Sequence, residues 1–347
     1  MKILTIAIPA YNVEKYLDRC LSTLVFHDQI NDVEIIIVND GSTDNTLAIS
    51  KKYQTYYPDL IFIINKVNGG HGSTINAAIA HAHGLYFMIV DGDDWVDSES
   101  LSKLVRTLGD INVDLVSTNY YRVDMNSGES EAVCQKGIVY NKVFSFETLN
   151  IKNIYFALAS SVFKTEILKR HNILLQENTY YVDVEYMLMP IPYVKTVLFL
   201  DLYVYRYFVG NTQQSIYIPT LVKRYSHHDR VLKRVIIYMN NKQSQLTQTH
   251  KDYINNILLQ LINTHYSISL DYNENKSDGL KKAKEFDDFL KAQSPELYTL
   301  SNKKLCCLRI YRKYNFNYKR VYHSPGYKLR NSFVFTLMKK IYYKLKL

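Results

Sequence analysis

Short β-branched runs alternate with helical patterns through the first 110 residues, and this alternation constrains the fold more than any other feature of the sequence. The apolar runs are Ile3–Ile8, Val33–Val38, Ile61–Ile64 and Leu85–Val90. Apolar residues recur at helical spacing between them, over residues 13–24, Thr46–Tyr57 and Thr74–His83. Strands that alternate with helices are joined by right-handed crossovers. The sequence therefore predicts an α/β fold with a mainly parallel sheet flanked by helices.

Polar, turn-forming residues follow three of these predicted strands. They are Pro9-Ala10-Tyr11-Asn12, Asn39-Asp40-Gly41-Ser42 and Asp91-Gly92-Asp93-Asp94. The carboxyl ends of parallel strands share one edge of a sheet, where open α/β sheets bind their ligands. We therefore expect the three segments to form one site. Asn12 is also placed to cap the first helix.

The segment Asp91–Asp94 places three carboxylates within four residues at the end of a buried strand. Carboxylates this close repel each other and raise each other's pKa. A divalent cation, Mn²⁺ or Mg²⁺, would relieve this repulsion, because both ions favour carboxylate and phosphate oxygens. The same residues also suit a solvated turn whose Asp97 or Ser98 caps the next helix. The cluster taken alone leaves both interpretations open.

Four motifs in one order connect these segments to a known family. They are Ala7–Asn12, Val38–Asp44, Asn68-Gly69-Gly70 with Asn76, and Asp91–Asp94. This order resembles glycosyltransferase family 2, of the bacterial polysaccharide and glycoconjugate type, over about residues 3–215. The resemblance implies a GT-A fold with a Rossmann-like sheet and an inverting glycosyltransferase. It also implies a nucleotide-sugar donor, typically a UDP-sugar, and Mn²⁺ or Mg²⁺ as cofactor.

The resemblance also implies roles for individual residues. Pro9 and Tyr11 would contact the nucleobase, and Asp40 would read it. Asp91 and Asp93 would be the two carboxylates of the DxD motif. Asp91 would lie near the ribose, and Asp93 would bind the metal ion, with Asp91 as a second ligand. Donor-contacting neighbours would be Asn68, Gly69, Gly70, Gly92 and Asp94.

The family's catalytic base is the Asp of a Glu-Asp pair that opens a helix, and Asp183 matches it here. Val182 replaces the usual Glu, and Glu185 is the fallback candidate. A helix cap at Asp183 is the non-catalytic interpretation. The roles of three further residues stay open. His71 would contact a phosphate or be solvated, and Arg206 would contact the leaving group or cover a sheet edge. His228 is a candidate third metal ligand.

Beyond residue 110 the pattern is weaker. It predicts strands at Val113–Val123, Val197–Leu200 and Tyr203–Tyr207, a mixed helical stretch at Phe156–His171, and helices at Lys251–Asp271 and Gly279–Ala292. We divide the chain into a GT-A catalytic domain (1–218, with a nucleotide-binding half 1–110 and an acceptor half 111–218), a helical extension (219–300) and a tail (301–347).

The tail is basic and aromatic. Thirteen of the 42 Lys and Arg residues and none of the 33 acidic residues lie in Leu297–Leu347. Asn331–Leu347 has the pattern of an amphipathic helix. Basic and aromatic residues on such a helix favour an anionic membrane surface. The apolar stripe would equally suit the protein's own helices or a second subunit of a homo-oligomer. The tail has no recognisable nucleic-acid-binding module, so we expect no nucleic acid.

Cellular context follows from what the sequence does not contain. The four cysteines, at positions 20, 134, 306 and 307, form no metal-binding or disulfide framework. The N-terminus has no leader-like apolar run, and no run is long enough to span a membrane. We expect a cytoplasmic protein, peripheral on the inner face of the cell membrane.

Functional alternatives remain at this stage. Val182 motivates a non-catalytic protein of glycan assembly that binds a nucleotide-sugar or acts as a scaffold. A sugar nucleotidyltransferase would show a glycine-rich basic loop after the first strand, and Pro9–Asn12 is not one. The spacing of Gly69, Gly70 and Gly72 fits neither a dinucleotide fingerprint nor a P-loop. The leading expectation is transfer of a sugar to a glycan, lipid-linked or glycoprotein acceptor.

Overall fold

The computed structural model describes residues 2–25, 31–210 and 218–330. The chain forms two compact units. Unit 1 comprises Met1–Tyr217 and Asn241–Ile254, and unit 2 comprises Ile218–Asn240 and Asn255–Leu347. Residues 241–254 therefore return to unit 1 after the first long helix of unit 2.

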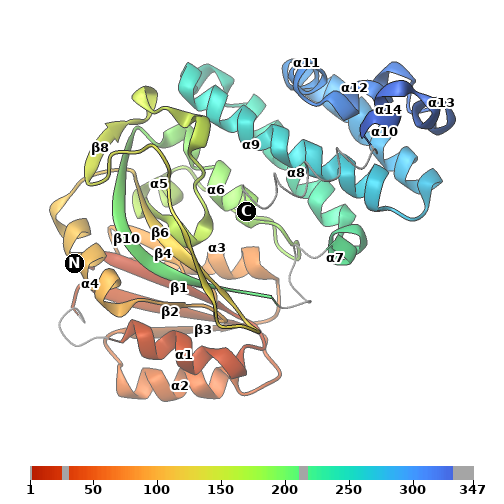
Figure 1. The fold of residues 1–347 in the computed structure, drawn as a ribbon. Helices are drawn as coiled ribbons and strands as arrows, with labels where there is room; N and C mark the ends of the chain where they lie inside the picture. The colour runs from red at the N-terminus through yellow and green to blue at the C-terminus, as the bar shows by residue number, and fades with distance from the viewer. Residues whose placement is uncertain (1, 26–30, 211–217, 331–347) are drawn as a thin grey trace. The chain divides into compact units, whose positions relative to one another are not determined.

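Unit 1 is built on a mixed sheet (Figure 1). The described strands form one ten-stranded sheet with the path β3-β2-β1-β4-β9-β6-β10-β5, while β7 pairs with β6 and β8 with β10. The four predicted N-terminal strands lie side by side and parallel, as β1 (Leu4–Ala10), β2 (Val33–Asp40), β3 (Ile61–Lys66) and β4 (Tyr86–Ile89). The α/β class and the mainly parallel character of this half are confirmed.

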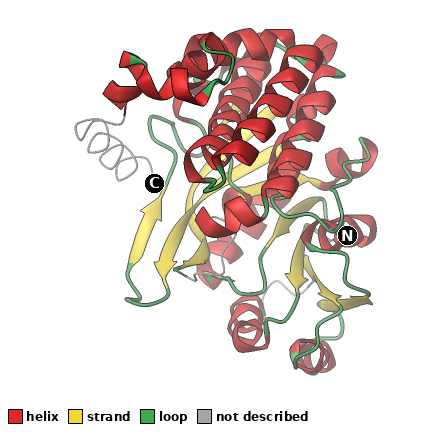
Figure 2. Ribbon diagram, turned by 90° about the vertical axis from the view of Figure 1, so that its right-hand side faces the viewer, coloured by secondary structure: helices red, strands yellow, loops and turns green. Residues whose placement is uncertain are grey.

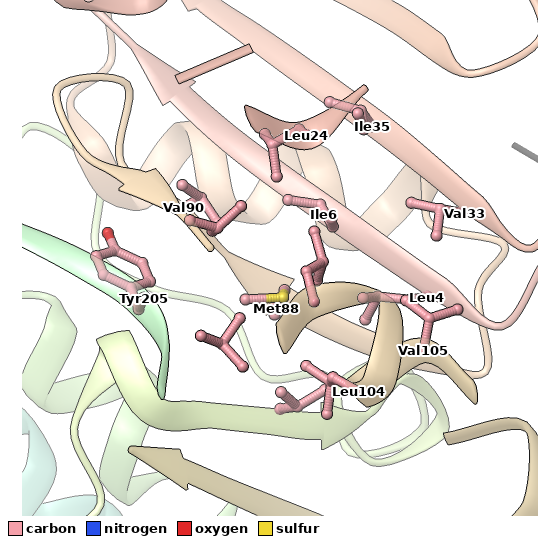
Figure 3. Packing of buried hydrophobic residues seen from close by; sticks show 14 of the residues in the cluster. Leu4, Ile6, Leu24, Val33, Ile35, Met88, Val90, Leu104, Val105 and Tyr205 are labelled. Atoms are coloured by element: carbon pink, nitrogen blue, oxygen red, sulfur yellow. The ribbon is translucent and has the colours of Figure 1, made fainter. Parts of the chain in front are cut away.

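Helices α1 (Glu14–Leu24) and α4 (Ser98–Asp110) pack on the same face of this sheet. Alternate residues of β1, including Leu4 and Ile6, meet Leu24 of α1 and Leu104 of α4 in one apolar core (Figure 3). Burying each such side chain stabilises the fold by about 1.5–3 kcal/mol before conformational entropy is counted. The remaining helices between these strands are α2 (Thr46–Tyr56) and α3 (His71–His81).

The start of each of the first and third helices differs from the prediction. Val13, not Asn12, is the N-cap residue of α1. Asn12 has φ 53° and its Oδ1 accepts a hydrogen bond from the Thr43 amide at 2.8 Å, so it links two strand-end segments. Helix α3 begins three residues earlier than predicted, because Gly70 takes φ 81° and forms its N-cap.

The second half of the sheet contains β5 (Trp95–Val96), β6 (Leu115–Asp124), β7 (Ser130–Val133), β8 (Lys142–Ser145), β9 (Ser161–Lys164) and β10 (Thr196–Val209). The mixed helix predicted at Phe156–His171 is wrong, because Ser161–Lys164 forms β9, antiparallel to both β4 and β6, before helix α5 (Thr165–Arg170). A short apolar run buried on both faces lacks the periodicity that separates strand from helix.

The two strands predicted at Val197–Leu200 and Tyr203–Tyr207 are one strand, β10. The pairing of β10 with β6 shifts register between Phe199 and Tyr203 and again before Tyr205. These irregularities bend the strand without ending it. Helix α6 (Asp183–Leu188) precedes β10 and carries the predicted base.

Unit 2 contains helices alone among its described residues (Figure 2). The helices are α7 (Ile218–Lys223), α8 (Tyr225–Asn240), α9 (Gln248–Tyr266, whose first turns belong to unit 1), the π-helix Ser267–Tyr272, α10 (Lys276–Gln293), α11 (Pro295–Lys304), α12 (Cys306–Lys313), α13 (Tyr318–His323) and α14 (Pro325–Arg330). The predicted helical extension is confirmed. No described helix combines the length and apolarity needed to span a bilayer. The amphipathic helix predicted at Asn331–Leu347 lies outside the described residues.

A buried ion pair joins the helices of unit 2. Asp287 accepts hydrogen bonds from Arg312 Nε at 2.8 Å and from the Tyr266 hydroxyl at 2.6 Å. Arg312 Nη1 also donates to the Tyr298 carbonyl at 3.0 Å. These contacts connect α9, α10, α11 and α12.

Two histidines also lie inside unit 2. The Nδ1 atoms of His228 and His265 are 3.0 Å apart, and the Tyr225 hydroxyl lies 2.9 Å from His265 Nε2. Asp229 Oδ1 lies 3.3 Å from the same Nε2. Burial, followed by the charge of His265, lowers the pKa of His228 from its ordinary 6.5 to about 3. His228 is therefore neutral in the folded protein at any ordinary pH.

The His228 pKa predicts that acid weakens the fold. The unfolded chain binds a proton at His228 as the pH falls through its ordinary pKa, whereas the folded chain does not. Stability should therefore fall by about 1 kcal/mol between pH 8 and pH 5.5 on account of this group. Urea unfolding at both pH values measures it. His228→Leu should flatten this dependence, and His323→Leu, at an exposed position of the same unit, should leave it unchanged.

Candidate active site

The structure brings the three polar strand-end segments together. The Gly92 amide after β4 donates to the Pro9 carbonyl at the end of β1, at 3.2 Å. The Asn12 side chain reaches Thr43 beyond β2. Strands β2, β1 and β4 are neighbours in the sheet, so their carboxyl ends meet at one edge.

The turn Asp91–Asp94 is held from outside by β10. The Tyr205 hydroxyl accepts from the Asp91 amide at 3.0 Å and donates to Asp94 Oδ2 at 2.6 Å. The Phe208 amide donates to Asp94 Oδ1 at 2.7 Å. Asp94 and Tyr205 are each 1% exposed, and the ring of Tyr205 extends from β10 into the core (Figure 3). Asp94 therefore anchors the turn, and its carboxylate faces protein on both oxygens.

Arg19 of α1 supports the same turn. Its Nη2 donates to the Asp93 carbonyl at 3.1 Å. The guanidinium lies 3.7 Å from the Trp95 ring centroid and 4.5 Å from that of Phe208. Sequence reasoning missed both Arg19 and the role of Tyr205. Each is separated from the turn by more than 70 residues, and only the folded sheet brings them to it.

The carboxylates of the turn are only partly neutralised by the protein. His71 Nε2 lies 2.9 Å from Asp91 Oδ1, and both side chains are about one-third exposed, at 32% and 31%. Burial and the charge of Asp91 raise the pKa of Asp93 to about 6, against the opposing charges of His71 and Arg19. Burial, and then the charges of Asp91 and Asp93, also raise the pKa of Asp94. The predicted mutual repulsion is present.

The buried carboxylate of Asp40 holds the glycine loop. It accepts from the Gly69 amide at 2.9 Å, the Gly70 amide at 2.8 Å and Lys66 Nζ at 2.7 Å. The Asn68 side chain donates to the Asp40 carbonyl at 2.9 Å. Asp40 is 2% exposed, so its carboxylate faces the loop. Its direct reading of a nucleobase stays a prediction.

The other predicted nucleobase contacts differ in exposure. The Tyr11 side chain is half-exposed, at 52%, immediately after β1. Pro9 is buried within β1, where its carbonyl receives the Gly92 amide. Tyr11 therefore has an exposed aromatic ring at this edge of the sheet, whereas the side chain of Pro9 is buried and only its backbone is placed for a contact.

The glycine loop and the start of α3 are fixed to the segment that leads to α6. The Asn178 amide donates to the Gly69 carbonyl at 2.6 Å, and the Asn76 side chain exchanges two hydrogen bonds with the backbone of Leu175. A Cβ atom at Gly72 would lie 2.1 Å from the Gln176 carbonyl oxygen. Only glycine permits this approach between α3 and the segment.

This segment delivers Asp183 to the site. Asp183 is the first residue of α6, and Val182 is the N-cap residue, so the interpretation of Asp183 as the cap is wrong. The Asp183 side chain is accessible, yet surrounding protein desolvates it and raises its pKa against the opposing charge of His71. Asp91 also contributes to this rise. Asp183 therefore lies within electrostatic range of His71 and Asp91.

Glu185, the fallback base, has another role. It is fully buried, and its carboxylate accepts from the Gln176 amide at 2.7 Å and from Gln176 Nε2 at 2.6 Å. It therefore holds the segment before Asp183. Val182 is also fully buried, an environment that suits its apolar side chain.

Two other sequence candidates have partners of their own. Arg206 donates to the Tyr203 carbonyl at 2.7 Å and to Asp97 at 3.1 Å, and its guanidinium covers the Tyr121 ring. It therefore has the sheet-covering role. Asp97 caps α4 through the Ser100 amide, as the turn interpretation predicts. His228 belongs to unit 2 and is buried against His265, so the structure gives it a structural partner.

Comparison with known proteins identifies the class. Residues 5–169 match the family model of glycosyl transferase family 2. The match covers just under half of the chain and places this N-terminal part in the family. The crystal structure of Staphylococcus aureus TarS 1–349 in complex with UDP-GlcNAc superposes with a TM-score of 0.68 at 20% identity, covering 96% of this chain and 93% of that chain. The fold is therefore GT-A with a helical C-terminal region.

Three relatives with similar sequences are also named as glycosyltransferases. Glycosyltransferase GlyA of Streptococcus pneumoniae is 30% identical over 46% of this chain and 23% of its own length. The uncharacterized glycosyltransferase EpsJ of Bacillus subtilis is 27% identical over 63% of this chain and 65% of its own. The poly(ribitol-phosphate) beta-N-acetylglucosaminyltransferase TarS is 23% identical over 76% and 44%. The chain thus spans between 23% and 65% of the lengths of these relatives.

The Tyr205 hydroxyl should be a large contributor to stability. In Tyr205→Phe, the buried Asp94 carboxylate loses one donor and the Asp91 amide loses its acceptor. We expect a loss of about 2–3 kcal/mol in the free energy of unfolding, measured by urea titration. Tyr56→Phe, which removes the hydroxyl of a 68% exposed tyrosine, should change it by less than about 0.5 kcal/mol. Equal effects would contradict the anchoring role.

Proposed function

We propose that the protein is an inverting glycosyltransferase that moves a sugar from a UDP-sugar to a hydroxyl of a glycan, lipid-linked or glycoprotein acceptor. One observation carries the proposal: the exposed side chain of Asp183 lies within electrostatic range of His71 and Asp91, although Asp183 comes from a different part of the chain. Inverting transfer needs this pairing of a donor-binding edge with a separate base. The UDP-GlcNAc bound in the TarS structure supports the choice of donor.

The donor would lie across the sheet edge. Tyr11 presents a half-exposed ring that suits stacking on the nucleobase, with the Pro9 backbone beside it. The Asn68–Gly70 loop, fixed by Asp40, borders the same edge. Gly92 lets the turn approach Pro9 closely, since a Cβ there would lie 3.1 Å from the Pro9 carbonyl oxygen.

Mn²⁺ or Mg²⁺ fits the donor set of the turn. Asp93 retains a raised pKa of about 6 although His71 and Arg19 are nearby, so the protein's own cations leave part of the charge uncompensated. Asp93, with Asp91, would hold the ion, while Asp94 is occupied by Tyr205 and Phe208. Among the described residues, no group of three His, Cys, Asp or Glu side chains is arranged as a complete site. The ion would neutralise charge on the diphosphate that leaves.

Asp183 would take the proton from the acceptor hydroxyl as its oxygen attacks the anomeric carbon. Desolvation raises the pKa of this carboxylate, which makes its ionised form a stronger base. Glu185 and Gln176 hold the preceding segment, so Asp183 enters the site from a fixed backbone. The sheet edge and α6 together would orient the two substrates for an in-line displacement.

Substitution of Asp183 separates turnover from binding. The wild-type protein should hydrolyse or transfer from one member of a UDP-sugar panel with Mn²⁺ present, and EDTA should abolish this. Asp183→Asn keeps the size of the side chain but removes the base. We expect turnover to fall by at least about 100-fold, while the dissociation constant for UDP measured by calorimetry changes by less than about threefold.

The outcomes of this experiment distinguish the alternatives. Binding of UDP-sugars without any turnover by the wild type would instead support the non-catalytic binding or scaffold function that Val182 suggests. Equal loss of binding and turnover in Asp183→Asn would contradict the role of the base. Glu185→Gln is the companion variant, and it should lower thermal stability because it weakens the contacts with Gln176.

His71 should support donor binding through Asp91. Groups that orient a metal-binding carboxylate commonly change metal affinity by about 10- to 100-fold when removed. We expect His71→Ala to weaken binding of free Mn²⁺, followed by electron paramagnetic resonance, and of UDP with Mn²⁺ by at least about tenfold. His81→Ala is the matched control, because His81 lies exposed at the other end of the same helix. Identical affinities in both variants would refute this role.

A further inference from the structure

Helices α11, α12 and α13 expose an unusual set of cations. Six Lys and Arg side chains are exposed, and we call them the cationic surface: Lys303, Lys304, Arg309, Lys313, Lys319 and Arg320. Arg309 and Lys313 lie one turn apart on α12, opposite the buried Leu308 and Tyr311. Helix α12 packs against α11 and α13, so the six residues occur on neighbouring helices (Figure 1).

The described residues provide no carboxylate partner for these six cations. Within residues 218–330, none of them forms an ion pair with a carboxylate. Arg312 of the same helix differs, because it points inward to Asp287. Over Pro295–His323 the sequence has seven basic residues and one acidic residue, Glu296. Unscreened like charges repel, so an arrangement of this kind is stabilised by an anionic partner.

The neighbouring helix of the same unit shows the contrast. Helix α10 contains five Lys and four acidic residues, and two of its lysines, Lys281 and Lys282, pair with carboxylates one turn away. Mixed charge of this kind is typical of a solvated helix face. The absence of acidic residues on α12 and α13 is therefore a local feature of these helices and not of the whole unit.

Tyrosines lie among the cations. The ring centroids of Tyr318 and Tyr322 are 5.8 Å apart, and those of Tyr322 and Tyr327 are 5.6 Å apart. Tyr322 is half-exposed, at 50%. Tyrosine combines an apolar ring with a polar hydroxyl, which suits the boundary between lipid headgroups and acyl chains. An anionic partner without an apolar region would leave these tyrosine rings in contact with water.

We propose that the cationic surface binds the anionic headgroups of a lipid membrane. Lysine and arginine near an anionic leaflet each strengthen binding by about fivefold, and the rings of Tyr318 and Tyr322 would enter the headgroup region. This inference does not depend on the proposed function, because it rests on unit 2 alone. It narrows the expectation for the tail (301–347) to the described helices α11, α12 and α13, whose cations are exposed.

Vesicle sedimentation of the full chain tests the proposal. The wild type should bind phosphatidylcholine vesicles that contain phosphatidylglycerol, bind pure phosphatidylcholine weakly, and be released by salt. The variant Arg309→Gln, Lys313→Gln, Lys319→Gln, Arg320→Gln should bind about 600-fold more weakly. The matched control replaces four exposed lysines of unit 1, Lys51, Lys52, Lys136 and Lys152, by Gln and should bind like the wild type.

A second control replaces Lys339, Lys340, Lys344 and Lys346 by Gln in the full chain. Retained binding in both controls, with loss in the α12–α13 variant, would support the proposal. Loss only in the second control would overturn it in favour of the C-terminal residues. Stronger binding to soluble polyphosphate than to vesicles would overturn it in favour of an anionic polymer. Thermal unfolding of each variant checks that the fold is intact.

Discussion

One hydroxyl group, that of Tyr205, connects the two halves of the sheet at the candidate site. It accepts from the Asp91 amide and donates to Asp94, so the turn after β4 takes its shape from a residue of β10. Arg19 completes the support from α1. The turn is held through Asp94 and its backbone, so the Asp93 side chain does not anchor it, while the Asp91 side chain contacts His71. The edge of the sheet where the candidate site lies therefore depends on contacts that span most of unit 1.

The N-terminal half of the fold could be predicted because its signals are local. Four short apolar runs define the parallel sheet, and the polar residues that follow three of them define the edge where the candidate site lies. The strand Ser161–Lys164 could not, because four residues buried on both faces show no period. Arg19 and Tyr205 escaped prediction for a different reason: their partners are far away in sequence. Likewise, the inward position of Glu185 follows from its contacts with Gln176, not from a pattern.

The basic side chains at the site only partly compensate the charge of its carboxylates. His71 lies against Asp91, and Arg19 is close to Asp93 and Asp94, yet burial keeps the pKa of Asp93 raised. Protein cations thus reduce the cost of collecting carboxylates without removing it. Asp40 shows the other solution, since Lys66 and two backbone amides satisfy its carboxylate. Asp40 at the end of β2 and Asp93 after β4 therefore differ in how far their charge is compensated.

The close contact between Gly72 and Gln176 has a consequence for how such a protein can diversify. Together with the Asn76–Leu175 pair, it fixes the start of α3, beside the loop that Asp40 holds, to the segment before Asp183. A substitution on either side of these contacts is constrained by the residues on the other side. New acceptor preferences would then arise in parts of the chain that these contacts do not constrain. The backbone around Asp40 and Asp183 would then stay constant while the acceptor changes.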